Sequence, residues 1–361
     1  MSDIALATSW RGVIEEFRDQ LPVTTDTPVI TLCEGGTPLL YAPHLSELTG
    51  AQVYLKVEGA NPTGSFKDRG MTLAVSKAVE AGSQALVCSS TGNTAASAAA
   101  YATRAGLTCA VLLPRAAVAA GKVAQALAFG ATLLEVEGSV DDCLVLATQL
   151  SEKYSVTLVN SVNPYRIAGQ RTAALEVVEQ LGTAPAAHFL PVGGAGNITA
   201  YWAGYRQAHE LGWSTRLPMM CGFQAAGAAP IVRDELVVNP QTVASAIRIG
   251  NPASWSSAVA ARDESGGLIA AVSDEQILAA HRLLSSVEAV FVEPASAAGV
   301  AGLLAVAEAS GATAERLRGH SVVCTVTGNG LKDPEWAVRA APPSVVIAAD
   351  VQLAANVLTL H

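Results

Sequence analysis

The sequence has few aromatic and few charged side chains. Phe, Trp and Tyr make up only 5% of its 361 residues and charged residues 15%, whereas half of the residues are apolar. No uncharged apolar run reaches the roughly 18 residues that a membrane-spanning helix needs, because residues such as Arg104, Lys122 and Glu308 interrupt every candidate. We therefore expect a soluble protein without membrane spans, long enough to bury a large apolar core.

The cysteines are too scattered to predict a metal site or disulfides, and the basic residues are too scattered to predict a nucleic-acid-binding surface. The six cysteines form no CxxC pair and have no histidine at ligand spacing, so neither a metal site nor a disulfide framework is predicted. We expect them to be small core residues in a reducing compartment. The net charge of −9 and the lack of any Lys/Arg run argue against a nucleic-acid partner. Residues 1–22 lack the pattern of a signal peptide, so the cytoplasm is the expected location and a small molecule the expected partner.

From residue 84 onward, short apolar segments rich in β-branched residues alternate with longer helical ones. Strands are predicted at 84–90, 107–114, 131–138, 156–161, 188–192, 217–224, 268–272, 289–292 and 321–327. Helices are predicted at 93–106, 121–130, 141–154, 166–181, 197–211, 273–288 and 294–309. Buried strands separated by helices are typical of doubly wound α/β sheets, whose strand ends are the usual place for ligands.

The number of predicted strands favours two sheets over one, because an average sheet holds about five or six strands. We expect residues 60–160 to form a smaller α/β domain, and residues 1–59 with 161–361 a larger one. Ser273 with Gln276 predicts a capping box, and Asp141 and Asp142 place negative charge in a first helical turn. The apolar segment 342–361 is compatible with one more strand and helix.

The segment "NPTGSFKDRG" (61–70) places Lys67 directly behind a Pro-Thr-Gly turn. One interpretation is a surface lysine in the first turn of a helix capped by Ser65, with Asp68 and Arg69 in solvent. The alternative is a lysine held in an apolar site, where its amine becomes a nucleophile able to form a Schiff base.

Two further segments follow predicted strands and open predicted helices. "SSTGNTAAS" (89–97) offers the hydroxyls of Ser90, Thr91 and Thr94 near free helix N–H groups, which suits a carboxylate, although simple N-capping by Ser90, Thr91 or Asn93 is the alternative. "PVGGAGN" (191–197) has three glycines that allow a concave anion nest for a phosphate. This loop is neither GxGxxG nor a P-loop, and a glycine turn without ligand is the alternative.

Two other segments carry groups that could bind a ligand. "NSVNPYRIAGQ" (160–170) places Arg166 near Asn160 and Ser161, a donor set suited to phosphate or carboxylate, or else a solvated arginine at a helix start. "CTVTGNG" (324–330) ends a strand at Thr327, whose hydroxyl could meet a heteroaromatic nitrogen or serve only in a turn.

Together, these segments resemble the fold-type II pyridoxal-phosphate enzymes and, among them, the threonine synthases of the short bacterial form. The resemblance runs from "EGGTPL" (34–39) to "GLKDP" (330–334) and includes "GNITAYW" and "VEPASAA". Dehydratases of the group usually carry a histidine after the asparagine of the second motif, and cysteine synthases read "TSGNTG". The resemblance implies two doubly wound open sheets, like those of the tryptophan synthase β subunit, with the active site between two domains.

The resemblance also implies roles for individual residues around pyridoxal 5'-phosphate. Lys67 would bind the cofactor covalently and carry out the proton transfers. The cofactor would further be held by Asn93 at its phenolic oxygen, by Thr327 at its pyridine nitrogen, and at its phosphate by the loop of Gly193, Gly194, Ala195, Gly196 and Asn197. The substrate would be bound by Ser90, Thr91, Asn93 and Thr94, with its carboxylate on Ser90, Thr91 and Thr94. The leaving phosphate would rest on Asn160, Ser161 and Arg166, with Thr94 shared between the two positions.

The implied reaction converts O-phospho-L-homoserine and water to L-threonine and phosphate, in a homodimeric enzyme. The family commonly has Asn where this chain has Gly194, and "RIEGQ" where it has "RIAGQ"; the segment 112–123 is also unusual. A related enzyme of the same cofactor class, such as a dehydratase or β-replacement synthase, is therefore an alternative. A nucleotide-binding α/β protein without this cofactor is another, although it lacks the expected fingerprints.

Overall fold

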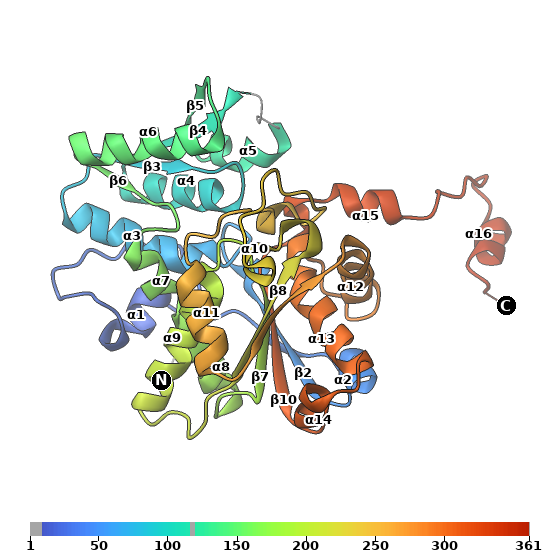
Figure 1. Cartoon of the computed structure of the whole chain (residues 1–361). Helices are drawn as coiled ribbons and strands as arrows, with labels where there is room; N and C mark the ends of the chain where they lie inside the picture. Colours follow the sequence, from blue (N-terminus) through green and yellow to red (C-terminus); the bar gives the residue numbers. More distant parts are fainter. Residues whose placement is uncertain (1–8, 116–119, 361) are drawn as a thin grey trace, which may run out of the picture.

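Two separate β-sheets organise the chain in the computed structural model, which describes residues 9–115 and 120–360 (Figure 1). The larger sheet has six strands in the order β1-β2-β10-β7-β8-β9 and the smaller has four in the order β5-β4-β3-β6. Only β1 runs antiparallel to its neighbour. The strands are β1 Leu39–Tyr41, β2 Gln52–Val57, β3 Ala85–Ser89, β4 Thr108–Pro114, β5 Thr132–Val136, β6 Val156–Leu158, β7 Ala187–Pro191, β8 Met219–Ala225, β9 Leu268–Val272 and β10 Ser321–Val326.

Helices cover both faces of the smaller sheet. Those around it are α3 Lys67–Glu80, α4 Asn93–Ala105, α5 Ala120–Ala128 and α6 Val140–Lys153. Met71 of α3 and Ala98 of α4 pack with Leu86 of β3 on one face. Cys143 and Ala147 of α6 pack against the other face. Figure 1 shows α6 on the opposite side of this sheet from α4.

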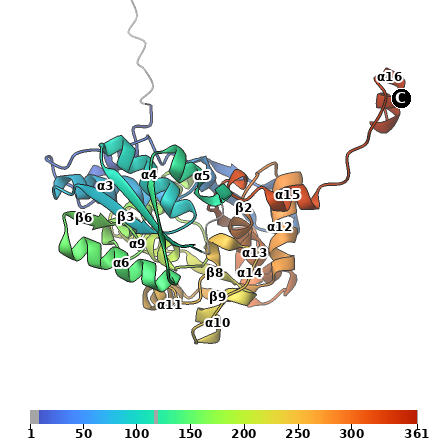
Figure 2. The ribbon, with the colours of Figure 1, turned by 90° about the horizontal axis from the view of Figure 1, so that it is seen from above.

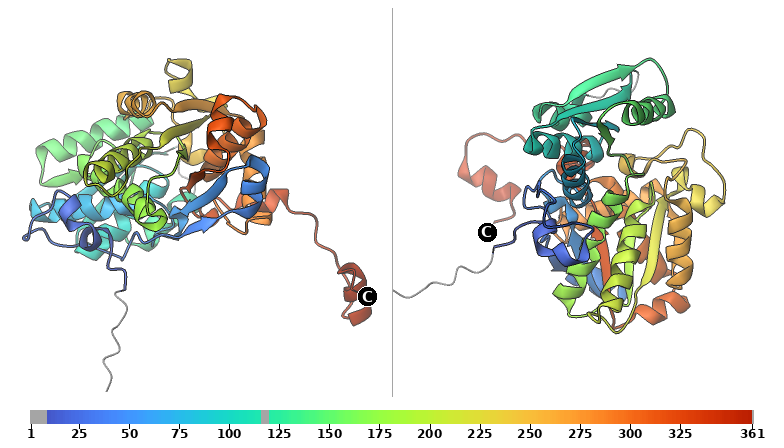
Figure 3. Two further views of the ribbon diagram at one scale, coloured as in Figure 1. Left: turned by 90° about the horizontal axis from the view of Figure 1, so that it is seen from below. Right: turned by 90° about the vertical axis from the view of Figure 1, so that its left-hand side faces the viewer.

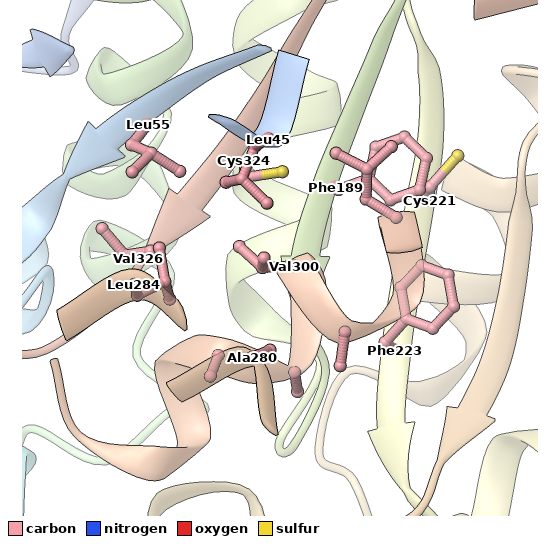
Figure 4. Close-up of a cluster of buried hydrophobic side chains, with 14 of the residues drawn as sticks. Leu45, Leu55, Phe189, Cys221, Phe223, Ala280, Leu284, Val300, Cys324 and Val326 are labelled. Carbon is pink, nitrogen blue, oxygen red and sulfur yellow. The ribbon is translucent and has the colours of Figure 1, made fainter. Parts of the chain in front are cut away.

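The larger sheet is also covered on both faces, as Figures 2 and 3 show from other sides. Helices α2, α12 and α13 pack on one face, where Phe189 and Phe223 stack with ring centroids 5.8 Å apart (Figure 4). Helices α1, α8, α9 and α11 pack on the other. The remaining helices are α1 Val13–Glu16, α2 Pro43–Thr49, α7 Pro164–Gln170, α8 Thr172–Leu181, α9 Gly196–Glu210, α10 Pro230–Arg233, α11 Trp255–Glu264, α12 Asp274–Ser286, α13 Ala298–Glu308, α14 Ala312–Leu317, α15 Glu335–Ala340 and α16 Val351–Val357. Short 3-10 helices are η1 Arg18–Gln20, η2 Glu58–Ala60, η4 Ala226–Ala228, η5 Ser245–Ile247, η6 Pro294–Ala297 and η7 Gly330–Lys332.

This architecture confirms the doubly wound α/β class and the presence of two sheets. The smaller sheet uses strands between residues 85 and 158, but the domain boundaries at 60 and 160 stay a prediction. The capping box of Ser273 and Gln276 is confirmed, and Asp142 forms one with Ser139. Among the described residues, every helix is too short or too polar to cross a bilayer.

Several details differ from the sequence-based expectation. Residues 289–292 form no strand, because Ala289 has a left-handed backbone with φ 56° and only Val292 makes an isolated bridge, to Asn329. The helix predicted at 166–181 divides at Arg171 into α7 and α8. Segment 342–360 contains α16 but no strand. Cys33 is exposed in a turn, whereas the other cysteines are buried as expected. Part of the unusual segment 112–123 lies outside the described residues.

A cluster of buried charges fixes α3 to the larger sheet. The guanidinium of Arg69 donates from Nε to Glu58 at 2.7 Å and from Nη2 to Glu176 of α8 at 2.8 Å. Lys56 of β2 donates to the same Glu176 at 2.8 Å. Burial alone would raise the pKa of Glu176, but the charges of Arg69 and Lys56 outweigh it and lower the pKa to about 2. We call these four residues the buried charge cluster.

Two glycines bring α3 and α7 into backbone contact. A Cβ atom added to Gly169 would lie 2.1 Å from the backbone oxygen of Arg69, and one added to Gly70 would lie 2.6 Å from that of Arg166. Real Cβ atoms do not approach so closely, so both positions require glycine. The contact holds Arg166 next to the first turn of α3.

The substitution Gly169→Ala tests this contact. We expect it to lower the free energy of unfolding by about 3 kcal/mol, because the backbones of two packed helices must move apart. Urea denaturation of the apoprotein measures the change. Gly311→Ala is the matched control, since no atom lies within 4 Å of its added Cβ, and we expect it to cost less than about 1 kcal/mol. Equal losses in the two variants would contradict the account.

Candidate active site

The turn that carries Lys67 is fastened to the end of β10. Ser65 forms an isolated bridge with Gly328, and the backbone N–H of Phe66 donates to the carbonyl oxygen of Thr327 at 3.0 Å. Lys67 is the first residue of α3, and its N-cap is Phe66, not Ser65. The predicted cap by Ser65 is therefore wrong, because the pairing with Gly328 places Ser65 before the helix.

Lys67 lies in a site that favours its uncharged form. Its Nζ lies 4.2 Å from the centroid of the Phe66 ring. The pKa of Lys67 is lowered to about 7, chiefly by burial and also by the charge of Arg166, whereas the charge of Glu293 opposes the shift. A large fraction of the amine is therefore unprotonated at neutral pH. The interpretation that places Asp68 and Arg69 in solvent is wrong, because both are fully buried, and Lys67 itself is half-buried.

The segment 89–94 joins β3 to α4 without a side-chain cap. The N-cap of α4 is Gly92, so the simple N-capping interpretation of Ser90, Thr91 or Asn93 is wrong. Ser90, Thr91 and Asn93 are partly exposed and Thr94 is buried. The carboxamide of Asn93 donates from Nδ2 to both oxygens of Glu293, at 3.0 and 3.2 Å.

The glycine loop joins β7 to α9 in a conformation suited to an anion. Ala195 is the N-cap of α9 and has φ 65°, so the chain turns sharply after Gly193 and Gly194 and the helix begins at Gly196. Successive N–H groups at such a turn and the helix dipole attract negative charge. Within the described part of the chain, Nδ2 of the buried Asn197 has no hydrogen-bond partner, which leaves a donor for a ligand.

Asn160, Ser161 and Arg166 lie near these loops. Asn160 ties the end of β6 to that of β3, because its carboxamide accepts from the N–H of Ser89 at 2.9 Å and donates to its carbonyl oxygen at 3.0 Å. Ser161 lies beside the glycine loop, with its Oγ 4.0 Å from a Cβ built on Gly194.

Arg166 is a buried cation that has no counter-charge within the described residues. It is 1% exposed, and Nη1 donates to the carbonyl oxygen of Val159 at 3.2 Å. In residues 9–115 and 120–360 it pairs with no carboxylate, and its buried Nε has no partner. Burial lowers the pKa of Arg166 to about 10. An unpaired buried guanidinium is costly, so this position indicates an anion from outside the chain.

Thr327 ends β10 with its hydroxyl paired to a residue that the sequence analysis did not assign. Its Oγ1 lies 3.0 Å from Oγ of Ser296, which also accepts from the N–H of Gly328 at 2.8 Å. Glu293 and Ser296 both belong to the string "VEPASAA" (292–298), which served there only as a mark of resemblance. The signal in the sequence that could identify Glu293 and Ser296 as site residues is an acid and a hydroxyl placed directly before an alanine-rich helix.

The structure thus gathers all five predicted segments at the carboxyl ends of β3, β6, β7 and β10. The backbone of Phe66, next to Lys67, is hydrogen-bonded to that of Thr327. Asn93 is hydrogen-bonded to Glu293, and Ser161 lies close to Gly194. The arrangement combines an amine, an anion nest and a second cationic position.

Comparison with known proteins agrees with this chemistry. Residues 30–328 match the family model described as "Pyridoxal-phosphate dependent enzyme". The chain belongs to the pyridoxal-phosphate dependent enzyme family. It is 59% identical over 334 residues to the threonine synthase of Mycobacterium tuberculosis H37Rv, covering 92% of each chain. It is 45% identical over 352 residues to that of Methanocaldococcus jannaschii, covering 95% of this chain and 86% of the other.

Solved structures share the fold of this chain. Maize serine racemase superposes with a TM-score of 0.75 at 21% identity, covering 91% of this chain and 96% of that one. The processed form of threonine deaminase isoform 2 from Solanum lycopersicum superposes with a TM-score of 0.71 at 21% identity, over 96% and 88%. The fold-type II class is therefore confirmed, and the alternative of a nucleotide-binding protein without this cofactor is wrong.

The residues present fit pyridoxal phosphate, the cofactor of the family. Lys67 supplies an amine whose pKa is lowered to about 7 through burial. The left-handed turn at Ala195 and the free donor of Asn197 fit a phosphate at the start of α9. The neutral hydroxyl of Thr327 fits the ring nitrogen.

The rate at which the apoprotein takes up pyridoxal phosphate should depend on pH with a midpoint near 7. Only the unprotonated amine attacks an aldehyde, so the rate should rise as pH passes through the lowered pKa of Lys67 and level off above it. Stopped-flow absorbance measures this rate. Arg166→Met should move the midpoint to higher pH, because Arg166 lowers the pKa of Lys67. A native rate that keeps rising to pH 10 would count against the account.

Proposed function

We propose that this chain is a threonine synthase, which converts O-phospho-L-homoserine and water to L-threonine and phosphate. The observation that carries the proposal is the 59% identity to threonine synthase across 92% of both chains. The geometry supports it, because a substrate with a carboxylate and a phosphate ester needs anion positions besides the one for the cofactor. The segment at 90–94 and the unpaired Arg166 provide them.

Around the cofactor, the chain supplies a phosphate loop, a ring contact and a mobile proton. Gly193–Asn197 would hold the cofactor phosphate, and Thr327, paired with Ser296, would face the ring nitrogen. When bound, pyridoxal phosphate draws electrons from the substrate so that its C–H bonds become acidic. Nζ of Lys67 would take up and return these protons, because a group with a pKa of about 7 exchanges protons readily at neutral pH.

Around the substrate, hydroxyl groups and a guanidinium would bind the two anions. Ser90, Thr91 and Thr94 would orient the carboxylate at the start of α4. Asn160, Ser161 and Arg166 would hold the phosphate as it leaves the γ carbon. The pairing of Asn160 with Ser89 supports this assignment, because it keeps the two positions at a fixed separation.

Gly194 stands where the family commonly has asparagine, and the structure leaves room for an added Cβ atom at this position. The nearest atoms to a Cβ built there are Cδ1 of Ile249 at 3.6 Å and Oγ of Ser161 at 4.0 Å. A Cβ atom would therefore fit without a clash, and glycine leaves that space open beside Ser161. We propose that Ser161 and Arg166 retain the substrate phosphate without the missing amide.

Phosphate release from O-phosphohomoserine tests the activity. We expect the native holoenzyme to release phosphate and form threonine, and Lys67→Ala to lose at least about a thousandfold in kcat because the proton-transferring amine is gone. Lys153→Ala, which removes an exposed lysine of α6, is the control and should keep full activity. If serine or threonine yields a keto acid while O-phosphohomoserine yields no phosphate, the enzyme is a dehydratase and the proposal fails.

We also propose that the enzyme works as a cytoplasmic homodimer. Support comes from α16, which stands clear of both sheets (Figure 1) and keeps Leu353 and Val357 exposed. The spacing of these two residues places them on one face of the helix. A helix this short is not stable alone in water, so we infer that this face packs on a second copy of the chain.

Light scattering should give twice the chain mass of 36.9 kDa. Leu353→Asp with Val357→Asp should shift the equilibrium toward the monomer, because it places two charges in the apolar contact. Gln352→Asp, which changes an exposed residue of the same helix, should leave the mass unchanged. A native monomer would refute the dimer, and a mass that ignores the double substitution would refute the role of α16.

A further inference from the structure

Glu293 is a buried carboxylate at the site for which the proposed reaction names no role. It is 4% exposed and directly precedes η6. Its N–H donates to the carbonyl oxygen of Gly328 at 3.1 Å, and a Cβ added to Gly328 would lie 2.4 Å from its Oε1. The carboxylate therefore lies against Gly328, the residue that follows Thr327.

Both oxygens of this carboxylate accept from one group, Nδ2 of Asn93, at 3.0 and 3.2 Å. An ionised carboxylate has no hydrogen to donate, so only the NH₂ end of the carboxamide can face it. The reversed amide would place its oxygen against the carboxylate, where two acceptors repel each other. Glu293 therefore selects one of the two orientations of the Asn93 amide.

We propose that Glu293 is a positioning residue that fixes the amide of Asn93 so that its second N–H is presented to the phenolic oxygen of pyridoxal phosphate. The inference rests on the proposed function and on the expectation, implied by the family resemblance, that Asn93 meets that oxygen. Among residues 9–115 and 120–360, Nδ2 of Asn93 donates to no residue other than Glu293, so one of its two N–H groups is available for the cofactor. An amide without this constraint would spend part of its time with its carbonyl oxygen toward an oxygen of the cofactor.

The groups around Glu293 determine the pH range in which it fixes the orientation of the Asn93 amide. Lys67 of α3, Lys332 and Asp333 at the end of η7, and Asn93 of α4 are the charged and polar groups that act on it. Burial raises the pKa of Glu293, and Asn93 with the two lysines opposes the shift. The orientation is fixed while Glu293 is ionised and is lost as pH falls through its pKa, because a protonated carboxyl can donate to the amide oxygen.

The test compares Glu293→Gln, Asn93→Ala and the double variant by titrating the apoproteins with pyridoxal phosphate. Glutamine has nearly the same shape but donates as well as accepts, so it no longer selects an orientation. We expect Glu293→Gln to weaken binding about tenfold, because it disrupts one hydrogen bond to a charged oxygen. In the Asn93→Ala background the same change should have no further effect. The visible band of the bound cofactor should shift in Glu293→Gln, because the phenolic oxygen loses a donor.

Two further variants keep the result interpretable. Glu275→Gln makes the same chemical change at an exposed position of α12 and should leave binding and spectrum unchanged. Glu293→Asp keeps the charge but withdraws it by one methylene, and should weaken binding less than Glu293→Gln. If circular dichroism shows that Glu293→Gln does not fold, Glu293→Asp takes its place in the comparison with Asn93→Ala and the double variant.

The outcomes separate this inference from the proposed function. Equal weakening by Glu293→Gln in the native and Asn93→Ala backgrounds, or no weakening and no spectral shift, would overturn the positioning role. A native protein that binds pyridoxal phosphate but releases no phosphate from O-phosphohomoserine would overturn the proposed reaction and leave the inference standing.

Discussion

The placement of a single lysine amine depends on the charges buried behind it. Arg69 follows Lys67 by two positions and is held by Glu58 and Glu176, while Lys56 binds the same Glu176. The buried charge cluster contains two cations and two carboxylates, so its own charges balance. Removing one partner from such a cluster costs about 3–5 kcal/mol, because a buried charge is left unpaired. The first turn of α3 is therefore fixed to β2 and α8 by strong and specific contacts.

This balance leaves the amine of Lys67 to respond to a small number of groups. Burial and Arg166 lower its pKa, and the charge of Glu293 opposes them. If the cluster carried a net negative charge, it would favour the protonated amine. The fold therefore meets two requirements that conflict in water: it holds the side chain of Lys67 in a fixed position, and it keeps the amine uncharged in a large fraction of the molecules.

The loops around this amine come from both sheets, and all of them are positioned in the same way. Each leaves the carboxyl end of a buried parallel strand, where the position of the chain is set by the sheet and the side chains are free for chemistry. Gly70 and Gly169 add a backbone contact between α3 and α7 that brings Arg166 to the same place. The anion positions thus depend on packing far from the ligand as well as on the residues that would touch it.

Much of this arrangement could be predicted from the sequence, because buried parallel strands and strand-end loops have clear local patterns. The segments with Asn93, Gly193 and Thr327 can be found for that reason, whereas the segment with Lys67 is indicated by its Pro-Thr-Gly turn. Strand β2 was missed because Lys56 interrupts its apolar run, and only the fold reveals the carboxylate that neutralises it. Glu293 was missed as a site residue because its contact with Asn93 spans 200 positions of the chain. The strand expected at 289–292 failed because the left-handed backbone of Ala289 leaves no local trace in the sequence.

The central claim is that the amine of Lys67 is the one that joins the cofactor. Borohydride reduction of the holoenzyme, followed by proteolysis and mass spectrometry, tests it directly. The account predicts that the phosphopyridoxyl group is recovered on the peptide containing Lys67, with other lysines unlabelled. Recovery of the label on another lysine, or on none, would contradict it.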